Sequence, residues 1–272
     1  MPLTISVLNK KGGVGKTSTC HHVAGSFAKR RQRVLLIDND PQASLTQGLC
    51  GSQAAASLPA ARTLAALYDD SLFADPATLI QPTAFDRIFL VPGSDHVTRF
   101  NLPDPHQSGT LQVALRDFVR DVGQNFDVIL IDCPPNLQLC SWAALVASDF
   151  VLVPLQAEDY GAQGITSVQR AVASVQQGPN ANLRLLGYLI TMFNKRLSIH
   201  IAYEDMLRRM YQDAVFTTNV PLSTHYKEAI VKRAPIGYYK PRAEAANVMD
   251  RLAGEMLRRA SAPLTRPARR TA

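Results

Sequence analysis

The sequence predicts one α/β domain, in which a mostly parallel, twisted sheet is flanked by helices on both faces. Continuous apolar runs typical of buried strands alternate with helix-like segments along the chain. A glycine-rich turn at residues 10–17 joins the first of these runs to a helix-like segment, Ser18–Lys29. Two later runs end in Asp38 and Asp132, which places both carboxylates at the edge where parallel sheets bind ligands.

The expected strands follow one another in a regular order. They are Leu3–Leu8, Val34–Ile37, Ile88–Val91, Val128–Ile131, Phe150–Leu155 and Leu185–Met192, with a short late strand at Val215–Thr217. Residues 50–62 and 92–108 are rich in Ala, Ser, Pro and Gly, and we expect surface loops there. We expect a single domain over residues 1–260 and a disordered basic tail over residues 261–272.

Composition excludes several classes of protein. The chain has 272 residues, of which 46% are hydrophobic, enough for a substantial core. No apolar run approaches the ~20 residues that span a bilayer, and the first strand begins too early to leave room for a signal peptide. The four cysteines, Cys20, Cys50, Cys133 and Cys140, form no C-x-x-C pair, so we expect reduced thiols in the cytoplasm rather than a zinc or redox site.

The net charge of +7 is unevenly distributed. Residues 1–183 hold 13 Lys and Arg against 15 Asp and Glu, a balance of −2, whereas residues 184–272 hold 16 against 7, a balance of +9. This asymmetry favours a polyanionic partner for the last third of the chain. A solvated basic surface is the plainer alternative.

The turn at residues 10–17 has the chemistry of a phosphate-binding loop. Its sequence is KKGGVGKT, which fits the end of the pattern G-x-x-x-x-G-K-[ST] but has Lys10 in place of the first glycine. Lys16 can reach the β- and γ-phosphates, and the Thr17 hydroxyl can bind Mg²⁺. Lys11 has no role in the standard loop, and a cation there points toward phosphate or toward a second nucleotide across a boundary. The expected nucleotide-binding residues of this segment are Lys11, Gly12, Gly13, Val14, Gly15, Lys16, Thr17 and Ser18.

The aspartates at the strand ends suit a hydrolytic site that uses Mg²⁺. Asp38 and Asp40 stand two residues apart, so they can serve a metal and a water, although an acidic turn that caps a helix would have the same sequence. The apolar strand that ends in Asp132 has the pattern of a Walker B carboxylate. We expect Thr17, Asp38 and Asp132 at the metal, and Cys133 to be a small buried residue.

Taken together, these motifs resemble the ParA/MinD family of deviant P-loop ATPases, and most of all its ParA members. The match covers residues 3 to about 258 and rests on the residue 10–17 loop, the Asp38-Asn-Asp-Pro-Gln segment and the Ile131-Asp-Cys-Pro-Pro segment. Val153-Pro-Leu-Gln and Thr191-Met-Phe-Asn-Lys-Arg resemble later family segments.

The resemblance implies a role for each matched residue. Lys11 would contact nucleotide across an ATP sandwich dimer, and Lys16 would bind phosphate as a catalytic residue. Asp40 would position the attacking water, while Thr17, Asp38 and Asp132 would serve Mg²⁺. Asn194 and the loop at Pro221 would border the adenine.

The resemblance also implies a cellular function. ParA relatives form homodimers with ATP, bind nucleoid double-stranded DNA without sequence preference, and release it after hydrolysis. A ParB-like protein or a cargo adaptor stimulates that hydrolysis. The outcome is segregation or positioning of a plasmid, a chromosome or a protein cluster.

The expected DNA contacts depart in part from the family pattern. Relatives often carry Ile-Pro-Arg-Asn-Val-Arg where this chain has Val220-Pro-Leu-Ser-Thr-His, so basic residues are missing there. Arg196 matches a family position tied to DNA. The expected DNA-binding residues are Arg196, Lys227, Lys232 and Arg233.

Two other functions are compatible with the same scaffold. A MinD-like membrane-associated regulator of cell division or positioning needs an amphipathic helix near the C-terminus. Segment Val248–Leu257 is helix-like, but we expect its Val248, Leu252 and Met256 to pack on the core. A metal-cluster carrier needs cysteines that bridge a dimer, and the cysteines of this chain lack that arrangement.

Overall fold

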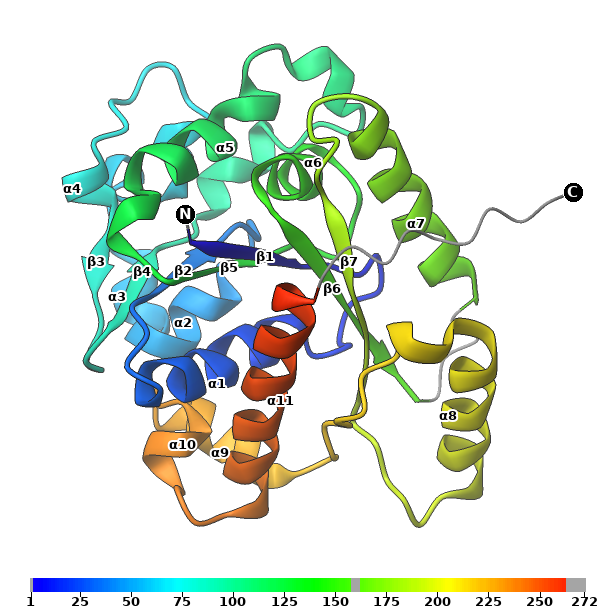
Figure 1. The fold of residues 1–272 in the computed structure, drawn as a ribbon. Coiled ribbons are helices and arrows are strands. Elements are labelled where there is room, and N and C mark those ends of the chain that lie inside the picture. Colours follow the sequence, from blue (N-terminus) through cyan, green and yellow to red (C-terminus); the bar gives the residue numbers. More distant parts are fainter. Residues whose placement is uncertain (1, 158–161, 263–272) are drawn as a thin grey trace, which may run out of the picture.

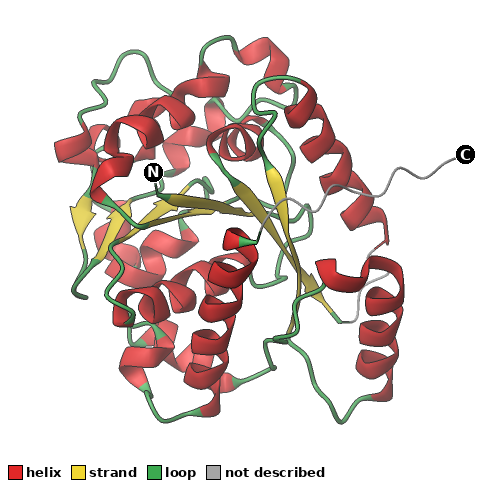
Figure 2. Ribbon diagram, in the orientation of Figure 1, coloured by secondary structure: helices red, strands yellow, loops and turns green. Residues whose placement is uncertain are grey.

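A seven-stranded sheet lies between two layers of helices in the computed structural model, which describes residues 2–157 and 162–262 (Figure 1; Figure 2). The strand order is β3-β4-β2-β5-β1-β6-β7, and all neighbours are parallel except β3 and β4. The strands are β1 (Leu3–Val7), β2 (Val34–Asp38), β3 (Gln81–Pro82), β4 (Ile88–Val91), β5 (Val128–Asp132), β6 (Phe150–Gln156) and β7 (Arg184–Thr191). The predicted α/β class is confirmed.

Helices connect the parallel strands and cover the two faces of the sheet. The α-helices are α1 (Lys16–Lys29), α2 (Ser44–Cys50), α3 (Ser52–Ala56), α4 (Pro76–Leu79), α5 (Leu111–Val122), α6 (Leu139–Ala147), α7 (Ala162–Gln177), α8 (Ser198–Tyr211), α9 (Thr224–Val231), α10 (Ile236–Tyr239) and α11 (Glu244–Ser261). Short 3₁₀ turns are η1 (Ala60–Arg62), η2 (Leu64–Leu67), η3 (Asp95–Arg99), η4 (Pro105–Ser108), η5 (Gly123–Asn125) and η6 (Gln212–Ala214). Across the described ranges, no helix combines the length and apolar character that a membrane span requires.

The sheet separates two apolar cores, which explains why strands such as β2 and β5 are apolar on both faces. In β2, Leu35 and Ile37 face the core formed with α5, α6 and α7, whereas Val34 and Leu36 face the core formed with α1 and α11. Successive side chains of a strand point to opposite faces, so a strand covered on both sides has no polar alternation. Figure 1 shows α5 and α6 above the sheet and α1 and α11 below it.

The late strand predicted at Val215–Thr217 is wrong. Val215 makes one isolated parallel bridge to Tyr188, and the ladder does not continue. The Phe216 N–H donates to the Tyr188 carbonyl, but the Thr218 N–H, the next one that a strand would direct to β7, donates to Glu255 of α11 at 2.9 Å. The helix side chain therefore takes the hydrogen bond that a strand needs.

Other boundaries differ by smaller amounts. The segments predicted as loops contain short helical turns, because Ser94 and Asp104 accept N–H bonds as caps of η3 and η4 and because α3 is an alanine-rich turn. The C-terminal helix is confirmed, and Val248, Leu252 and Met256 are buried as expected. Of the predicted tail, Ser261 ends α11, and residues 263–272 lie outside the described residues.

Helix α1 approaches the segment before α10 unusually closely at Gly25. A Cβ at this position would lie 2.5 Å from Pro235 Cβ. We therefore expect Gly25→Ala to reduce the free energy of unfolding by about 1–3 kcal/mol, as overpacking does in a rigid core. Denaturant unfolding followed by circular dichroism would measure the change.

Gly254, in the middle of α11, offers a matched control. The nearest atoms to a Cβ there are the ends of the Arg258 and Arg30 side chains, both 3.5 Å away and able to move. Gly254→Ala should stabilise the protein by up to about 1 kcal/mol, since alanine is the better helix former. Equal effects of the two substitutions would contradict the tight packing at Gly25.

Candidate functional site

Three adjacent strands bring the sequence motifs to one edge of the sheet. Strand β5 lies between β1 and β2, and its Asp132 is in register with Val7 on one side and Asp38 on the other. The glycine-rich loop follows β1 directly and leads into α1. Because carboxyl ends of parallel strands share an edge, the loop and both aspartates meet there.

The loop is held open by its own backbone and by neighbouring side chains. Gly13 and Gly15 have φ values of 75° and 85°, which favour glycine. Buried Asn9 accepts from the Lys11 N–H at 3.0 Å and donates to the Pro154 carbonyl at 2.7 Å. The loop is thereby fastened to β6 before any ligand binds.

Lys16 points back across the loop. Its Nζ donates to the Lys11 carbonyl oxygen at 3.0 Å, and the residue is only 7% exposed. Burial lowers the pKa of Lys16, while the nearby carboxylates of Asp132 and Asp40 oppose that shift. The side chain of Lys11 itself is exposed, so the two lysines occupy different environments.

Asp38 and Asp132 are fully buried side by side. Burial raises the pKa of Asp38 to about 7, although the hydrogen bonds that it accepts from Thr46 act in the opposite direction. Burial and the neighbouring Asp38 charge raise the pKa of Asp132 well above its usual value. Asp38 Oδ1 and both Asp132 oxygens lack a hydrogen-bond partner among the described residues. The Thr17 side chain faces Asp132 and favours its charged form.

These orphaned oxygens fit a hard divalent cation. Mg²⁺ is usually held by one or two carboxylates together with nucleotide phosphates and waters rather than by an all-protein cage. Accordingly, the described part of the chain contains no cluster of three or more His, Cys, Asp and Glu side chains around one point. Asp38, Asp132 and the Thr17 hydroxyl are the protein groups that would face the ion, and the ion would neutralise the buried carboxylates.

The buried Asp38 should make the stability of the nucleotide-free protein depend on pH. Because its folded pKa is raised from 3.8 to about 7, Asp38 stabilises the fold fully below pH 3.8, and this contribution is lost as the pH rises to about 7. Relative to Asp38→Asn, the wild type should lose about 2 kcal/mol of unfolding free energy between about pH 5 and about pH 7. Denaturant titrations at both pH values would measure this difference.

The comparison with Asp38→Asn cancels the titration of groups that do not interact with Asp38. His21 and His22, whose pKa values are lowered by burial, change stability in the opposite direction over the same range, but both proteins contain them. A wild-type curve that stays parallel to the variant curve would show that Asp38 remains ionised in the folded state.

Asp40 lies between the buried carboxylates and the solvent. It is 9% exposed, and its Oδ1 accepts from the Gln42 N–H at 2.9 Å. Burial raises the pKa of Asp40, while Gln42 and Lys16 oppose the shift. The carboxylate is thus fixed within the electrostatic field of Lys16, near the predicted phosphate position.

A small apolar pocket adjoins the loop. Its volume is about 150 Å³, and it is lined by Gly15, Ser18, Thr19, Thr191, Met192, Val220, Pro221, Leu222, Ser223, Tyr226, Lys227, Ile230 and Met249. An apolar slot next to a phosphate loop suits a planar base. Pro221 is among the lining residues and Asn194 is not; the Asn194 side-chain oxygen accepts from the Arg196 N–H at 3.0 Å. Contact of either residue with adenine stays a prediction.

The four predicted DNA contacts are exposed, and three of them lie on α9 or directly after it. Arg196 precedes α8, Lys227 lies on α9, and Lys232 and Arg233 follow α9. The Arg233 guanidinium lies against α2–α3, where a Cβ on Gly51 would come within 2.5 Å of it. Arg233 thus packs in part on the protein.

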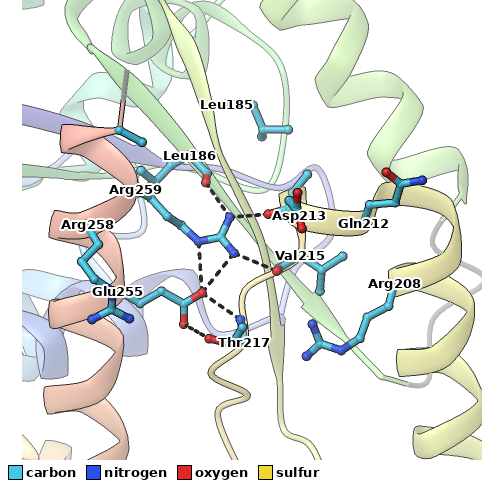
Figure 3. Close-up of a pocket in the computed structure, with 12 residues that line it drawn as sticks. Leu185, Leu186, Arg208, Gln212, Asp213, Val215, Thr217, Glu255, Arg258 and Arg259 are labelled. Carbon is cyan, nitrogen blue, oxygen red and sulfur yellow. Dashed lines mark hydrogen bonds and ion pairs between the residues drawn. The ribbon is translucent and has the colours of Figure 1, made fainter. Parts of the chain in front are cut away.

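A spacious cleft lies away from the loop, between α11, β7 and η6. It measures about 600 Å³, and Figure 3 shows Arg259 at its centre. This guanidinium donates to Glu255 and to the carbonyls of Leu186, Asp213 and Val215, and Glu255 also accepts from Thr217. Burial would raise the pKa of Glu255, but the hydrogen bonds from Thr217 and Thr218 outweigh burial and lower it. Arg259 and Glu255 therefore hold α11 against β7 and the segment that follows η6.

Sequence motifs did not identify several residues that shape the site. The Thr191 hydroxyl donates to the Val14 carbonyl at 2.9 Å, and Asn39 donates to the Cys140 carbonyl at 2.6 Å while accepting from the Tyr68 hydroxyl at 3.0 Å. Asn39 could have been noticed from its place between two aspartates. Cys133 is buried as predicted, and burial raises its thiol pKa.

Comparison with known proteins agrees with this geometry. Residues 3–185 match an AAA domain family. The chain is 33% identical to sporulation initiation inhibitor protein Soj of Bacillus subtilis, covering 93% of this chain and 97% of that protein. It is likewise 33% identical to the chromosome-partitioning ATPase Soj of Thermus thermophilus, covering 94% and 95%.

A solved structure of similar fold contains a bound nucleotide and metal. Cobyrinic acid a,c-diamide synthase from Mycobacterium smegmatis, with bound ADP and magnesium, superposes with a TM-score of 0.77 at 26% identity and covers 95% of both chains. The predicted loop, the carboxylates at the strand ends and the Soj relatives lead to one assignment. The chain belongs to the ParA/MinD family of deviant P-loop ATPases.

Proposed function

We propose that this chain is a partition ATPase. It binds DNA as an ATP-bound dimer and is released from DNA after ATP hydrolysis. The observation that carries the proposal is the loop geometry, in which buried Lys16 holds the Lys11 carbonyl while the Lys11 side chain is exposed. Lys11 directly precedes the Gly-Gly pair and its side chain is exposed, so we assign it to the nucleotide of a partner subunit. Both Soj relatives support the partition role.

In this proposal each residue of the site has one task. Lys16 and the N–H groups of the loop bind the phosphates of ATP, and Thr17, Asp38 and Asp132 face Mg²⁺. Asp40 orients the attacking water, and Lys11 reaches the nucleotide of the partner subunit. The apolar pocket that includes Pro221 takes the adenine.

The DNA-bound state accounts for the charge distribution. The balance of +9 over residues 184–272 gives sequence-independent attraction to phosphates, and Arg196, Lys227, Lys232 and Arg233 are the proposed contacts. A ParB-like or cargo-adaptor partner would stimulate hydrolysis and release the protein from the nucleoid in the cytoplasm. The MinD-like alternative is less favoured, because the apolar face of α11 is already buried.

Nucleotide-dependent DNA binding tests the proposal. The protein should bind duplexes of unrelated sequence with equal affinity, and only in the presence of ATP. Light scattering should show that the protein becomes dimeric under the same conditions. The four contacts of each subunit make eight in the dimer, which predicts a loss of about 10⁴-fold in affinity between about 50 and about 200 mM salt. Arg196→Ala and Lys232→Ala should each reduce the salt slope by about two, one for each subunit.

The matched control is Arg120→Ala, which removes an exposed arginine on α5, the opposite layer. It should leave DNA affinity unchanged. Binding that ignores nucleotide or salt would overturn the DNA-bound state, although nucleotide hydrolysis could still occur.

A further inference from the structure

Thr46 on α2 holds one oxygen of the Asp38 carboxylate through two hydrogen bonds. The Thr46 N–H donates to Asp38 Oδ2 at 2.8 Å, and its hydroxyl donates to the same oxygen at 2.6 Å. The hydroxyl oxygen also accepts from the Gly93 N–H at 2.8 Å. Thr46 and Asp38 are both 0% exposed, so water does not compete for these bonds.

Gly93 confines the same carboxylate from the other side. A Cβ at this position would lie 2.8 Å from Asp38 Cγ, which leaves no room for a larger residue. The chain from Gly93 through Thr46 to Asp38 therefore joins the loop after β4 to the end of β2. It fixes the rotation of the carboxyl group.

The orientation of the Asp38 carboxylate leaves its second oxygen, Oδ1, for a ligand. Asp38 Oδ1 is buried and has no hydrogen-bond partner in the described ranges, and the same holds for both oxygens of Asp132, its register partner on β5. Buried polar atoms normally have partners, and an unpartnered one costs stability. Within residues 2–157 and 162–262, the hydrogen bonds to the Asp38 carboxylate all reach Oδ2, and Oδ1 remains available to a ligand.

We propose that Thr46 is a positioning residue for the cation site: it ties Asp38 Oδ2 into the protein so that Oδ1 faces the Mg²⁺ shell. The inference rests on the nucleotide–Mg²⁺ site proposed above and adds a residue that no motif contains. Partners that orient a metal-facing carboxylate commonly change metal affinity by about 10- to 100-fold when they are removed. The hydroxyl is the essential group, because the backbone N–H persists in any variant.

A purely structural role predicts a different result. Thr46 is the third residue of α2, so its bonds to Asp38 also stabilise the start of that helix. If they did only this, loss of the hydroxyl would lower the melting temperature and leave metal affinity unchanged. Metal affinity of the folded protein therefore separates the two roles.

The experiment titrates Mn²⁺ into the full-length protein saturated with ADP and measures free Mn²⁺ by electron paramagnetic resonance. Thr46→Val should weaken Mn²⁺ binding by about 10-fold, and Thr46→Ser should restore it. ADP affinity measured in EDTA should be the same in all three proteins. If Thr46→Val does not fold, Thr46→Cys serves instead, since a thiol is a weak donor.

Ser148→Ala is the control for losing a buried hydroxyl. Ser148 donates to the Ala144 carbonyl at 2.7 Å. It lies just before β6, at the amino ends of the parallel strands, whereas Asp38 lies at the carboxyl ends. It should lower stability without changing Mn²⁺ affinity. Wild-type Mn²⁺ affinity in Thr46→Val, or no rescue by Thr46→Ser, would overturn the positioning role alone. A wild type that binds no Mn²⁺ with ADP would overturn the metal site and this inference together.

Discussion

Lys16→Ala is expected to weaken ATP binding by about 30- to 150-fold and to abolish hydrolysis, because a charge-assisted bond of about 2–3 kcal/mol is lost. In the free protein, the Lys16 ammonium is held by the Lys11 carbonyl, within a site where burial has already lowered its pKa. The negative charge of a bound phosphate would stabilise the Lys16 ammonium in place of the water that burial excludes. Fluorescence titration with a labelled ATP analogue would measure the affinity.

Lys10→Ala provides the comparison for Lys16→Ala. Lys10 is exposed and occupies the position of the missing first glycine. Its removal deletes the same charge from the same loop, so ATP affinity should stay within about twofold of the wild type if position, rather than net charge, decides binding. Equal losses in both variants would mean that Lys16 acts only through the general field of the loop.

The sequence predicted the centre of the fold because its signals there are local. Strands β2 and β5 are apolar runs that end in an aspartate, and β1, although it contains Thr4 and Ser6, leads directly to the glycine-rich loop. The carboxyl ends of parallel strands share one edge, so these motifs were expected to meet. Strand β3 was missed because it has two residues, one of them Pro82, and pairs antiparallel at the sheet edge. Short edge pairing leaves no periodic pattern.

The supporting residues of the site could not be predicted, because they come from distant parts of the chain. Thr46 and Gly93 are 8 and 55 positions from Asp38, and neither carries a motif. Thr46 acts through the direction of its hydroxyl, and Gly93 acts because it has no Cβ. Both matter only once the folded sheet brings these residues next to Asp38. Asp132, by contrast, ends the apolar strand β5, and Lys16 ends the glycine-rich loop, so local sequence predicts both.

The second large effect is expected from Asp40→Ala, which should reduce the rate of ATP hydrolysis by about 100- to 1000-fold. The carboxylate is held by the Gln42 N–H on the solvent side of the site and does not contact the loop glycines through any hydrogen bond found in the described residues. ATP affinity should therefore stay close to that of the wild type. Single-turnover hydrolysis and equilibrium binding would separate the two quantities.

Asp40→Asn sharpens the test, because asparagine can still accept the Gln42 N–H bond but has no negative charge. If the carboxylate orients and activates water, both variants should lose hydrolysis, and ATP-bound dimers should persist on DNA. Lys16→Ala would then lose binding, whereas Asp40→Ala would lose only the chemical step, which assigns ground-state binding and transition-state stabilisation to different residues. Wild-type turnover in Asp40→Ala would remove Asp40 from the chemistry and leave it as the residue that shapes the turn before α2.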